Sequence, residues 1–96
     1  MEKQWVLYIL ECKDGSLYTG ITDHLQRRLA AHWKGKGAKY TRGRCPLILR
    51  YVELCEDHSG ALRREIQIKR LPRSEKMKLC QQMNHDRLSA LDTNEQ

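Results

Sequence analysis

Glu65 is the residue whose position in the sequence first suggests chemistry. It lies in a segment with helical spacing, and the apolar arc of that helix consists of Ala61, Leu62, Ile66 and Ile68. Glu65 and Lys69 fall inside this arc. The side chains predicted to lie outside it are Arg63, Arg64, Gln67 and Arg70. A carboxylate on the core-facing side of a helix requires a partner or a metal ion, because burying an unpaired charge is costly.

The helical pattern leaves two interpretations of Glu65 open. In the structural interpretation, its carboxylate forms an ion pair with Lys69 or with an arginine. In the functional interpretation, it is an active-site acid or a ligand of Mg²⁺ or Mn²⁺, which prefer hard oxygen ligands.

Two tyrosines, Tyr8 and Tyr18, offer a second kind of chemistry. Strand alternation places Tyr8 on the same side as Val6, and Tyr18 on the same side as Gly20. Each phenol could be a half-buried packing residue, or it could face a site. The unperturbed pKa of a phenol is near 10, so a tyrosine needs help from a neighbouring group to act as a base at neutral pH.

A β-hairpin is expected to carry both tyrosines. Trp5 to Cys12 is apolar and rich in β-forming residues, and Leu17 to Thr22 reads as the return strand. Asp14-Gly15 between them is a strong hairpin signal. Gly20, inside the second strand, indicates a bulge or a close backbone approach.

A helix is expected to follow the hairpin. Asp23 can act as its N-cap, and the helix runs to about Trp33. Arg28 and His32 are one turn apart along an edge of its apolar face, whereas Arg27 points to solvent.

The rest of the chain is predicted to form a loop, a strand and two helices. The predicted elements are a cationic loop at residues 35–46, a strand at 47–54, a helix from Asp57 or Ser59 to about Leu71, and a helix from Ser74 to about Met83. The order β-β-α-β-α-α predicts an α+β fold with a small three-stranded antiparallel sheet flanked by helices. Residues 1–83 are predicted to form one domain, and residues 84–96 a polar C-terminal tail.

The distribution of charge indicates a polyanionic partner. The net charge is +6, and no acidic residue occurs between Asp23 and Glu53. The basic residues of that interval are Arg27, Arg28, Lys34, Lys36, Lys39, Arg42, Arg44 and Arg50. A stretch with charge of one sign favours nucleic acid, although a solvated surface that aids solubility is the simpler alternative.

Several classes of protein are disfavoured by the composition. No apolar run is long enough to span a bilayer, and the first residues lack the pattern of a signal peptide, so we expect a cytoplasmic protein without membrane contact. The four cysteines, Cys12, Cys45, Cys55 and Cys80, are expected to be reduced. They form no C-x-x-C pair, so a structural zinc site is not expected.

The tyrosines, the arginine and the glutamate together resemble a known family. Val6–Tyr8 and Tyr18–Gly20 resemble the paired tripeptides of the GIY-YIG nucleases. Arg28 lies eight residues after Gly20, where that family places its catalytic arginine, and His32 lies where the family has a histidine or tyrosine. Glu65 matches the metal-binding glutamate of the family.

The resemblance covers roughly Trp5 to Leu71 and is similar to small stand-alone bacterial members, which share a loop like Lys36–Gly43. The chain departs from the family at two points. The first tripeptide keeps only its tyrosine, and Ile21 stands where the repair-incision members carry a lysine.

The resemblance implies hydrolysis of phosphodiester bonds, with DNA as the expected substrate and Mg²⁺ or Mn²⁺ as the cofactor. Glu65 would hold one divalent ion, which would polarise the scissile phosphate. Arg28 would stabilise charge on the phosphoryl oxygens. Tyr18 would orient or deprotonate the attacking water, Tyr8 would complete the catalytic site by hydrogen bonding, and His32 would relay a proton.

The loop after the first helix would bind the nucleic-acid backbone. Its predicted contact residues are Lys34, Lys36, Lys39, Tyr40, Arg42 and Arg44. Phosphate contacts position a substrate without reading its sequence. A partner protein could therefore supply targeting, and the chain itself is expected to be a monomer.

Two other functions stay open at this point. The first is a catalytically weak nucleic-acid-binding module of the same fold, although Glu65 would repel DNA unless a cation lay between them. The second is a small adaptor domain with a basic face, for which the acid-free stretch has no purpose.

Overall fold

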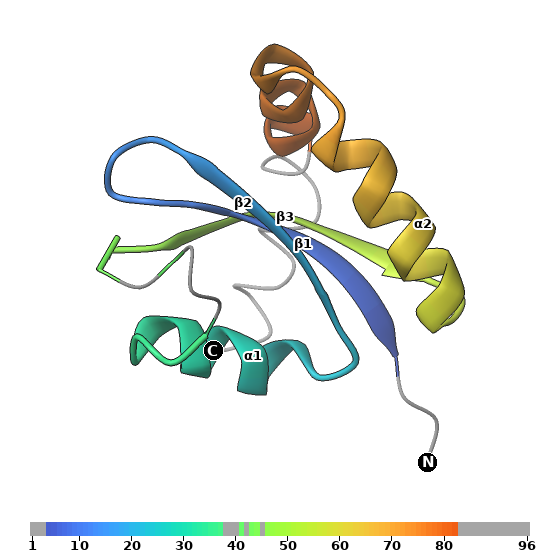
Figure 1. Cartoon of the computed structure of the whole chain (residues 1–96), viewed down its shortest axis with the longest axis horizontal. Helices are drawn as coiled ribbons and strands as arrows, with labels where there is room; N and C mark the ends of the chain where they lie inside the picture. Colours follow the sequence, from blue (N-terminus) through green and yellow to red (C-terminus); the bar gives the residue numbers. More distant parts are fainter. Residues whose placement is uncertain (1–3, 38–40, 42, 45, 83–96) are drawn as a thin grey trace.

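The computed structural model describes residues 4–37, 41, 43–44 and 46–82 of the chain. The elements are β1 (Trp5–Glu11), β2 (Leu17–Thr22), α1 (Leu25–Trp33), β3 (Ile48–Cys55) and α2 (His58–Lys69), followed by a helix at residues 73–82 (Figure 1). The predicted α+β fold, with its order of elements, is confirmed. The predicted tail at residues 84–96 lies outside the described residues.

A three-stranded antiparallel sheet with the order β2-β1-β3 forms the centre of the molecule. β1 is the middle strand because its apolar residues can be covered on both faces. The predicted turn joins it to β2: Asp14 Oδ1 accepts hydrogen bonds from Ser16 N and Oγ at 3.0 and 2.6 Å. Gly15 supplies the positive φ, 84°, that this turn requires.

The two faces of the sheet carry separate hydrophobic clusters. On one face, Tyr8 packs with Val6 and with Leu29 of α1. On the other face, Leu7 packs with Ile68 of α2 and with Cys80 of the last helix. Figure 1 accordingly shows α1 and α2 on opposite sides of the sheet. Tyr8 and Val6 therefore share one face, as strand alternation predicted, and α1 covers that face.

The N-terminus of α1 differs from the prediction. The N-cap is His24 and not Asp23, because His24 Nδ1 accepts the hydrogen bond from Arg27 N at 3.3 Å. Thr22 Oγ1, at the end of β2, accepts from His24 N at 3.1 Å and places this residue at the cap. The second helix begins after one of its two predicted caps, Asp57, whose Oδ1 accepts from Gly60 N at 2.7 Å.

The buried side of α2 is also rotated from the predicted arc. Ala61 and Ile68 are fully buried, but Leu62 and Ile66 are 41% and 50% exposed. Arg64, predicted to lie outside the arc, is half-buried because β3 offers it a carboxylate partner. Glu65 keeps its predicted place on the packed side of the helix, where its side chain is 19% exposed.

Cys12, Cys55 and Cys80 are free thiols, whereas Cys45 lies outside the described residues. No helix among the described residues is both long and apolar enough to cross a bilayer.

Candidate active site

The Tyr8 hydroxyl is the centre of a polar cluster on the α1 face of the sheet. Tyr8 is fully buried, and its Oη lies 2.8 Å from His32 Nε2 of α1. Arg28 Nε, one turn earlier on α1, donates to the same Oη at 3.4 Å. Residues from β1 and α1 therefore meet at one phenol hydroxyl, which contacts both α1 side chains.

Gly20 allows this arrangement by the close approach expected of it. The register pairs Gly20 with Tyr8 across β1 and β2 without a bulge. A Cβ at residue 20 would lie 2.6 Å from Tyr8 Oη and 2.9 Å from Tyr18 Cε2, distances that real Cβ atoms do not adopt. The missing side chain thus makes the space in which the two tyrosines come together.

Tyr18 lies on β2, beside this cluster and closer to the surface. Its ring centroid is 6.3 Å from that of Tyr8 and 5.4 Å from that of His32. Tyr18 and Arg28 are half-buried, whereas Tyr8 and His32 are fully buried. Of these four predicted residues, Tyr18 and Arg28 are therefore the ones that can touch a bound molecule.

Electrostatics fix the protonation of the cluster. Burial raises the pKa of Tyr8 to about 12, against a lowering effect of Arg28. The hydrogen bond to Tyr8 raises the pKa of Arg28. Burial, and then the positive charge of Arg28, lower the pKa of His32. At neutral pH the cluster holds a neutral phenol, a neutral imidazole and a charged guanidinium.

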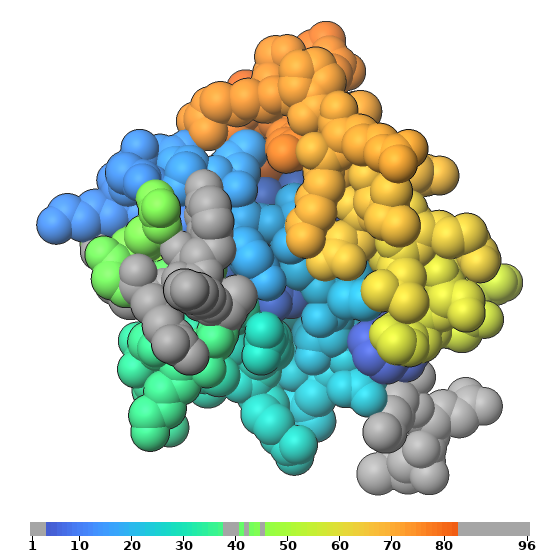
Figure 2. Space-filling model, viewed as in Figure 1, coloured from blue at the N-terminus to red at the C-terminus, as the bar shows by residue number. Residues whose placement is uncertain are grey.

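Glu65, on α2, influences the Tyr8 hydroxyl through its charge. Its charge contributes to the raised pKa of Tyr8, so the carboxylate lies within electrostatic range of that hydroxyl. Lys69 Nζ is 3.3 Å from Glu65 Oε2, and this lysine side chain is 52% exposed. The ion pair that the structural interpretation of Glu65 expects is thus present, with Lys69 as the partner. Figure 2 shows the surface of β2 between α1 and α2.

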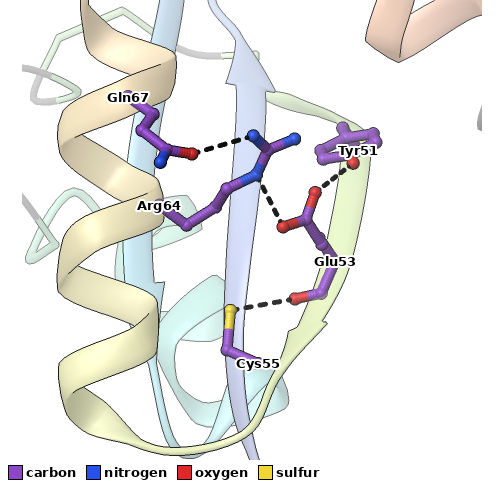
Figure 3. Close-up of polar contacts among 5 residues, drawn as sticks. All are labelled: Tyr51, Glu53, Cys55, Arg64 and Gln67. Carbon is purple, nitrogen blue, oxygen red and sulfur yellow. Dashed lines mark hydrogen bonds and ion pairs between the residues drawn. The ribbon is translucent and has the colours of Figure 1, made fainter.

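A separate polar network holds α2 against β3. Arg64 Nε donates to Glu53 Oε2 at 2.7 Å, and Tyr51 Oη donates to the other oxygen of that carboxylate (Figure 3). Gln67 Oε1 accepts a further bond from Arg64 Nη1 at 3.1 Å. Since Glu65 is the next residue along α2, this network fixes the position of the helix that carries it.

The predicted nucleic-acid contacts are only partly described. Lys34 and Lys36, at the end of α1, are exposed. Arg44 forms an ion pair with Asp14 in the hairpin turn, and Lys13 N donates to Arg44 O at 2.9 Å. The loop is thereby attached to the hairpin. Lys39, Tyr40 and Arg42 lie outside the described residues.

Two loop residues that sequence reasoning missed complete the cluster. Thr41 is fully buried, and its Oγ1 lies 2.8 Å from His32 Nδ1. A Cβ at Gly37 would lie 2.3 Å from the same nitrogen, so only glycine lets the backbone cover the imidazole there. Neither residue lies in a helix or strand that the sequence predicts, so no periodicity indicates which side chain turns inward.

Comparison with known proteins agrees with this geometry. Residues 4–79 match the family model described as the GIY-YIG catalytic domain. The chain belongs to the GIY-YIG family. It is 52% identical to a UPF0213 protein of Oceanobacillus iheyensis over 81 residues, which are 84% of this chain and 94% of the relative. A UPF0213 protein of Halobacterium salinarum is 53% identical over 70 residues, 73% of this chain and 91% of that protein.

Two solved structures have the same GIY-YIG-type fold. The solution NMR structure of a UPF0213 protein from Bacillus halodurans is 43% identical, with a TM-score of 0.56. That of a protein from E. faecalis is 39% identical, with a TM-score of 0.61. Each alignment covers 86% of this chain and 88% of the other. The predicted membership of the GIY-YIG nuclease superfamily, among small stand-alone bacterial proteins, is confirmed.

Proposed function

We propose that this GIY-YIG protein is a metal-dependent endonuclease that hydrolyses phosphodiester bonds of DNA. The observation that carries the proposal is the position of Arg28. Its guanidinium is anchored on the buried Tyr8 hydroxyl, and its pKa is raised first by Tyr8 and further by Tyr18. A permanent positive charge held between two phenols, in a member of a nuclease family, suits a phosphate group.

Arg28 would bind the scissile phosphate. A guanidinium has five N–H donors, and the bond from Nε to Tyr8 uses one of them. The remaining donors can stabilise the charge that develops on the phosphoryl oxygens. Because the bond to Tyr8 holds the guanidinium in place, little reorganisation is needed when that charge appears.

Tyr18 would act on the attacking water. The two buried residues, Tyr8 and His32, would act through Arg28. Tyr18 is the more exposed of the two tyrosines, so its hydroxyl can orient the water or accept its proton. Tyr8 is a poor base, since its pKa is about 12, and together with His32 it is assigned a positioning role. The proton relay predicted for His32 would end at this buried phenol.

Glu65 fits a single Mg²⁺ or Mn²⁺ ion. It offers a half-buried carboxylate within electrostatic range of Tyr8. The described residues contain no group of three or more metal-binding side chains, so the other ligands would be water and phosphate oxygens, as is usual for Mg²⁺. When bound, the ion would polarise the phosphate and lower the pKa of water. Lys69 would then have to leave the carboxylate.

Substrate binding is proposed to extend along the end of α1 and the following loop. Lys34 and Lys36 are exposed there, and the chain has a net charge of +6. Such contacts hold the sugar-phosphate backbone without reading bases. We keep a cytoplasmic location, a monomeric state and a targeting partner protein as expectations.

The test of this function compares Arg28→Ala with Arg27→Ala. Both variants remove one arginine from α1, but Arg27 is exposed and its predicted orientation is toward solvent. With Mg²⁺ present, cleavage of single-stranded, duplex and branched DNA by Arg28→Ala should fall about 10²- to 10³-fold, as for loss of one oxyanion-binding donor. Arg27→Ala should keep most of the activity. Equal rates for the three proteins on every substrate would reject the nuclease proposal.

One observation favours the alternative of a catalytically weak nucleic-acid-binding module. The Glu65 carboxylate already has a cationic partner in Lys69, which a purely structural glutamate would also have. In that case the protein would bind DNA with a dependence on salt, and neither Mg²⁺ nor Mn²⁺ would bring about cleavage.

A further inference from the structure

Thr41 is a buried polar residue to which the proposed mechanism gives no role. It is fully buried, and its Oγ1 lies 2.8 Å from His32 Nδ1. His32 is itself fully buried, with Tyr8 Oη at 2.8 Å from its other nitrogen. Both ring nitrogens of one imidazole thus have a hydroxyl partner, one from the loop and one from β1.

The direction of these hydrogen bonds follows from the donors available. Arg28 can only donate, so the Tyr8 oxygen accepts from it. In the part of the chain that the structure describes, the hydrogen-bond partners of the Tyr8 hydroxyl are Arg28 and His32. A buried hydroxyl proton needs an acceptor, and Nε2 of a neutral His32 is the acceptor within reach. The imidazole must then carry its proton on Nδ1 and donate it to Thr41 Oγ1.

Gly37 reinforces this orientation of the ring. An added Cβ there would lie 2.3 Å from Nδ1 and 2.7 Å from Cγ of His32, so the loop backbone packs directly on the imidazole. The ring is confined on another side by Tyr18, at 5.4 Å between centroids. The ring is therefore held with Nδ1 facing Thr41 Oγ1, which can accept the proton that the Nδ1–H tautomer donates.

We propose that Thr41 is a positioning residue that holds His32 as the Nδ1–H tautomer, so that Tyr8 donates to His32 and presents its oxygen to Arg28. The inference rests on the proposed function for its catalytic consequence, but the hydrogen-bond chain itself does not. The chain runs from Arg28 through Tyr8 and His32 to Thr41. The loop that carries the basic residues would in this way control the orientation of the phosphate-binding guanidinium.

The test uses Thr41→Val, which keeps the shape of the side chain and removes the acceptor, and Thr41→Ser, which keeps the hydroxyl. Thr19→Val is the matched control, because it removes another buried threonine hydroxyl, from β2. The ¹⁵N chemical shifts of the His32 ring report the tautomer, and thermal unfolding reports whether each variant is folded. Steady-state cleavage of DNA gives kcat and KM.

The inference predicts the Nδ1–H tautomer in the wild type, in Thr41→Ser and in Thr19→Val, and loss of that single tautomer in Thr41→Val. In Thr41→Val, kcat should fall by at least about tenfold with KM little changed, since a wrong tautomer is costly in catalysis. Thr41→Ser should restore kcat. An Nε2–H tautomer in the wild type would overturn the inference, and so would an unchanged tautomer in Thr41→Val.

The two proposals can fail separately. A wild-type protein that cleaves no nucleic acid would reject the nuclease function, while the ring shifts would still decide the role of Thr41. If Thr41→Val does not fold, the tautomer in the wild type and in Thr41→Ser decides the direction of the chain.

Discussion

The buried Tyr8 hydroxyl is the residue on which the candidate site depends most. It joins Arg28 to His32, and its burial excludes it from direct contact with a substrate. The sequence identified Tyr8 through alternation and family resemblance, because the strand pattern is strong. It did not predict full burial, since a tyrosine in a half-apolar strand is compatible with either environment.

Replacement of Tyr8 by phenylalanine should reveal how folding shifts the pKa of the Tyr8 phenol. The pKa of Tyr8 is raised to about 12 in the folded protein, whereas an unfolded phenol titrates near 10. A raised pKa contributes stability that is present below about pH 10 and is lost as the pH rises toward 12. Relative to Tyr8→Phe, the wild type should therefore lose roughly 1 kcal/mol of unfolding free energy between pH 9 and pH 11.

Chemical denaturation at a series of pH values measures this difference. At neutral pH, Tyr8→Phe should already be about 1 to 3 kcal/mol less stable than the wild type, because it leaves His32 Nε2 without its partner. A stability difference that does not change between pH 9 and pH 11 would show that folding does not raise the pKa of Tyr8.

At the scale of elements, the β1–β2 hairpin was the most predictable part and α2 the least. The apolar run of β1 and the Asp14-Gly15 turn fixed both strands within one residue of their observed bounds. The rotation of α2 could not be predicted, because it depends on Glu53, which β3 places beside Arg64. Thr41 was missed for a related reason: its role comes from a contact with His32 that local sequence does not encode.

The ion pair between α2 and β3 should contribute measurably to stability. Arg64→Ala is expected to destabilise the fold by about 1 to 2 kcal/mol, since it removes a charge-assisted bond to a half-buried carboxylate. Arg63→Ala is the matched control, because Arg63 is the exposed neighbour, and it should change stability by less than about 0.5 kcal/mol.

A double-mutant cycle with Glu53→Gln isolates the pair. The effects of Arg64→Ala and Glu53→Gln should not add, because each variant breaks the same 2.7 Å contact. Additive free energies of unfolding would mean that the contact does not hold α2 in place.

At the scale of the whole molecule, charge is expected to govern the affinity for nucleic acid. The chain has a net charge of +6, and Lys34 and Lys36 are exposed at the end of α1. Replacing both by alanine should make the salt dependence of duplex DNA binding shallower by about 1.8 in the logarithmic slope, if each neutralises one phosphate.

Binding should be measured without a divalent metal, so that cleavage does not interfere. Lys76→Ala with Lys78→Ala is a control of equal charge on the helix at residues 73–82, which Figure 1 places on the opposite side of the sheet from α1. The control pair should leave the slope unchanged. Equal slopes in both double variants would show that the end of α1 is not part of the binding surface.

The role of Glu65 as a protein ligand of a catalytic metal is the central claim, and single-turnover cleavage of DNA over a Mg²⁺ titration tests it most directly. Glu65→Gln is compared with Glu75→Gln, since Glu75 is also a helical glutamate paired with a lysine. Wild type and Glu75→Gln should cleave in proportion to bound Mg²⁺, and Glu65→Gln should be slower by at least about 100-fold. Cleavage by Glu65→Gln at the wild-type rate and with the wild-type Mg²⁺ dependence would contradict the account.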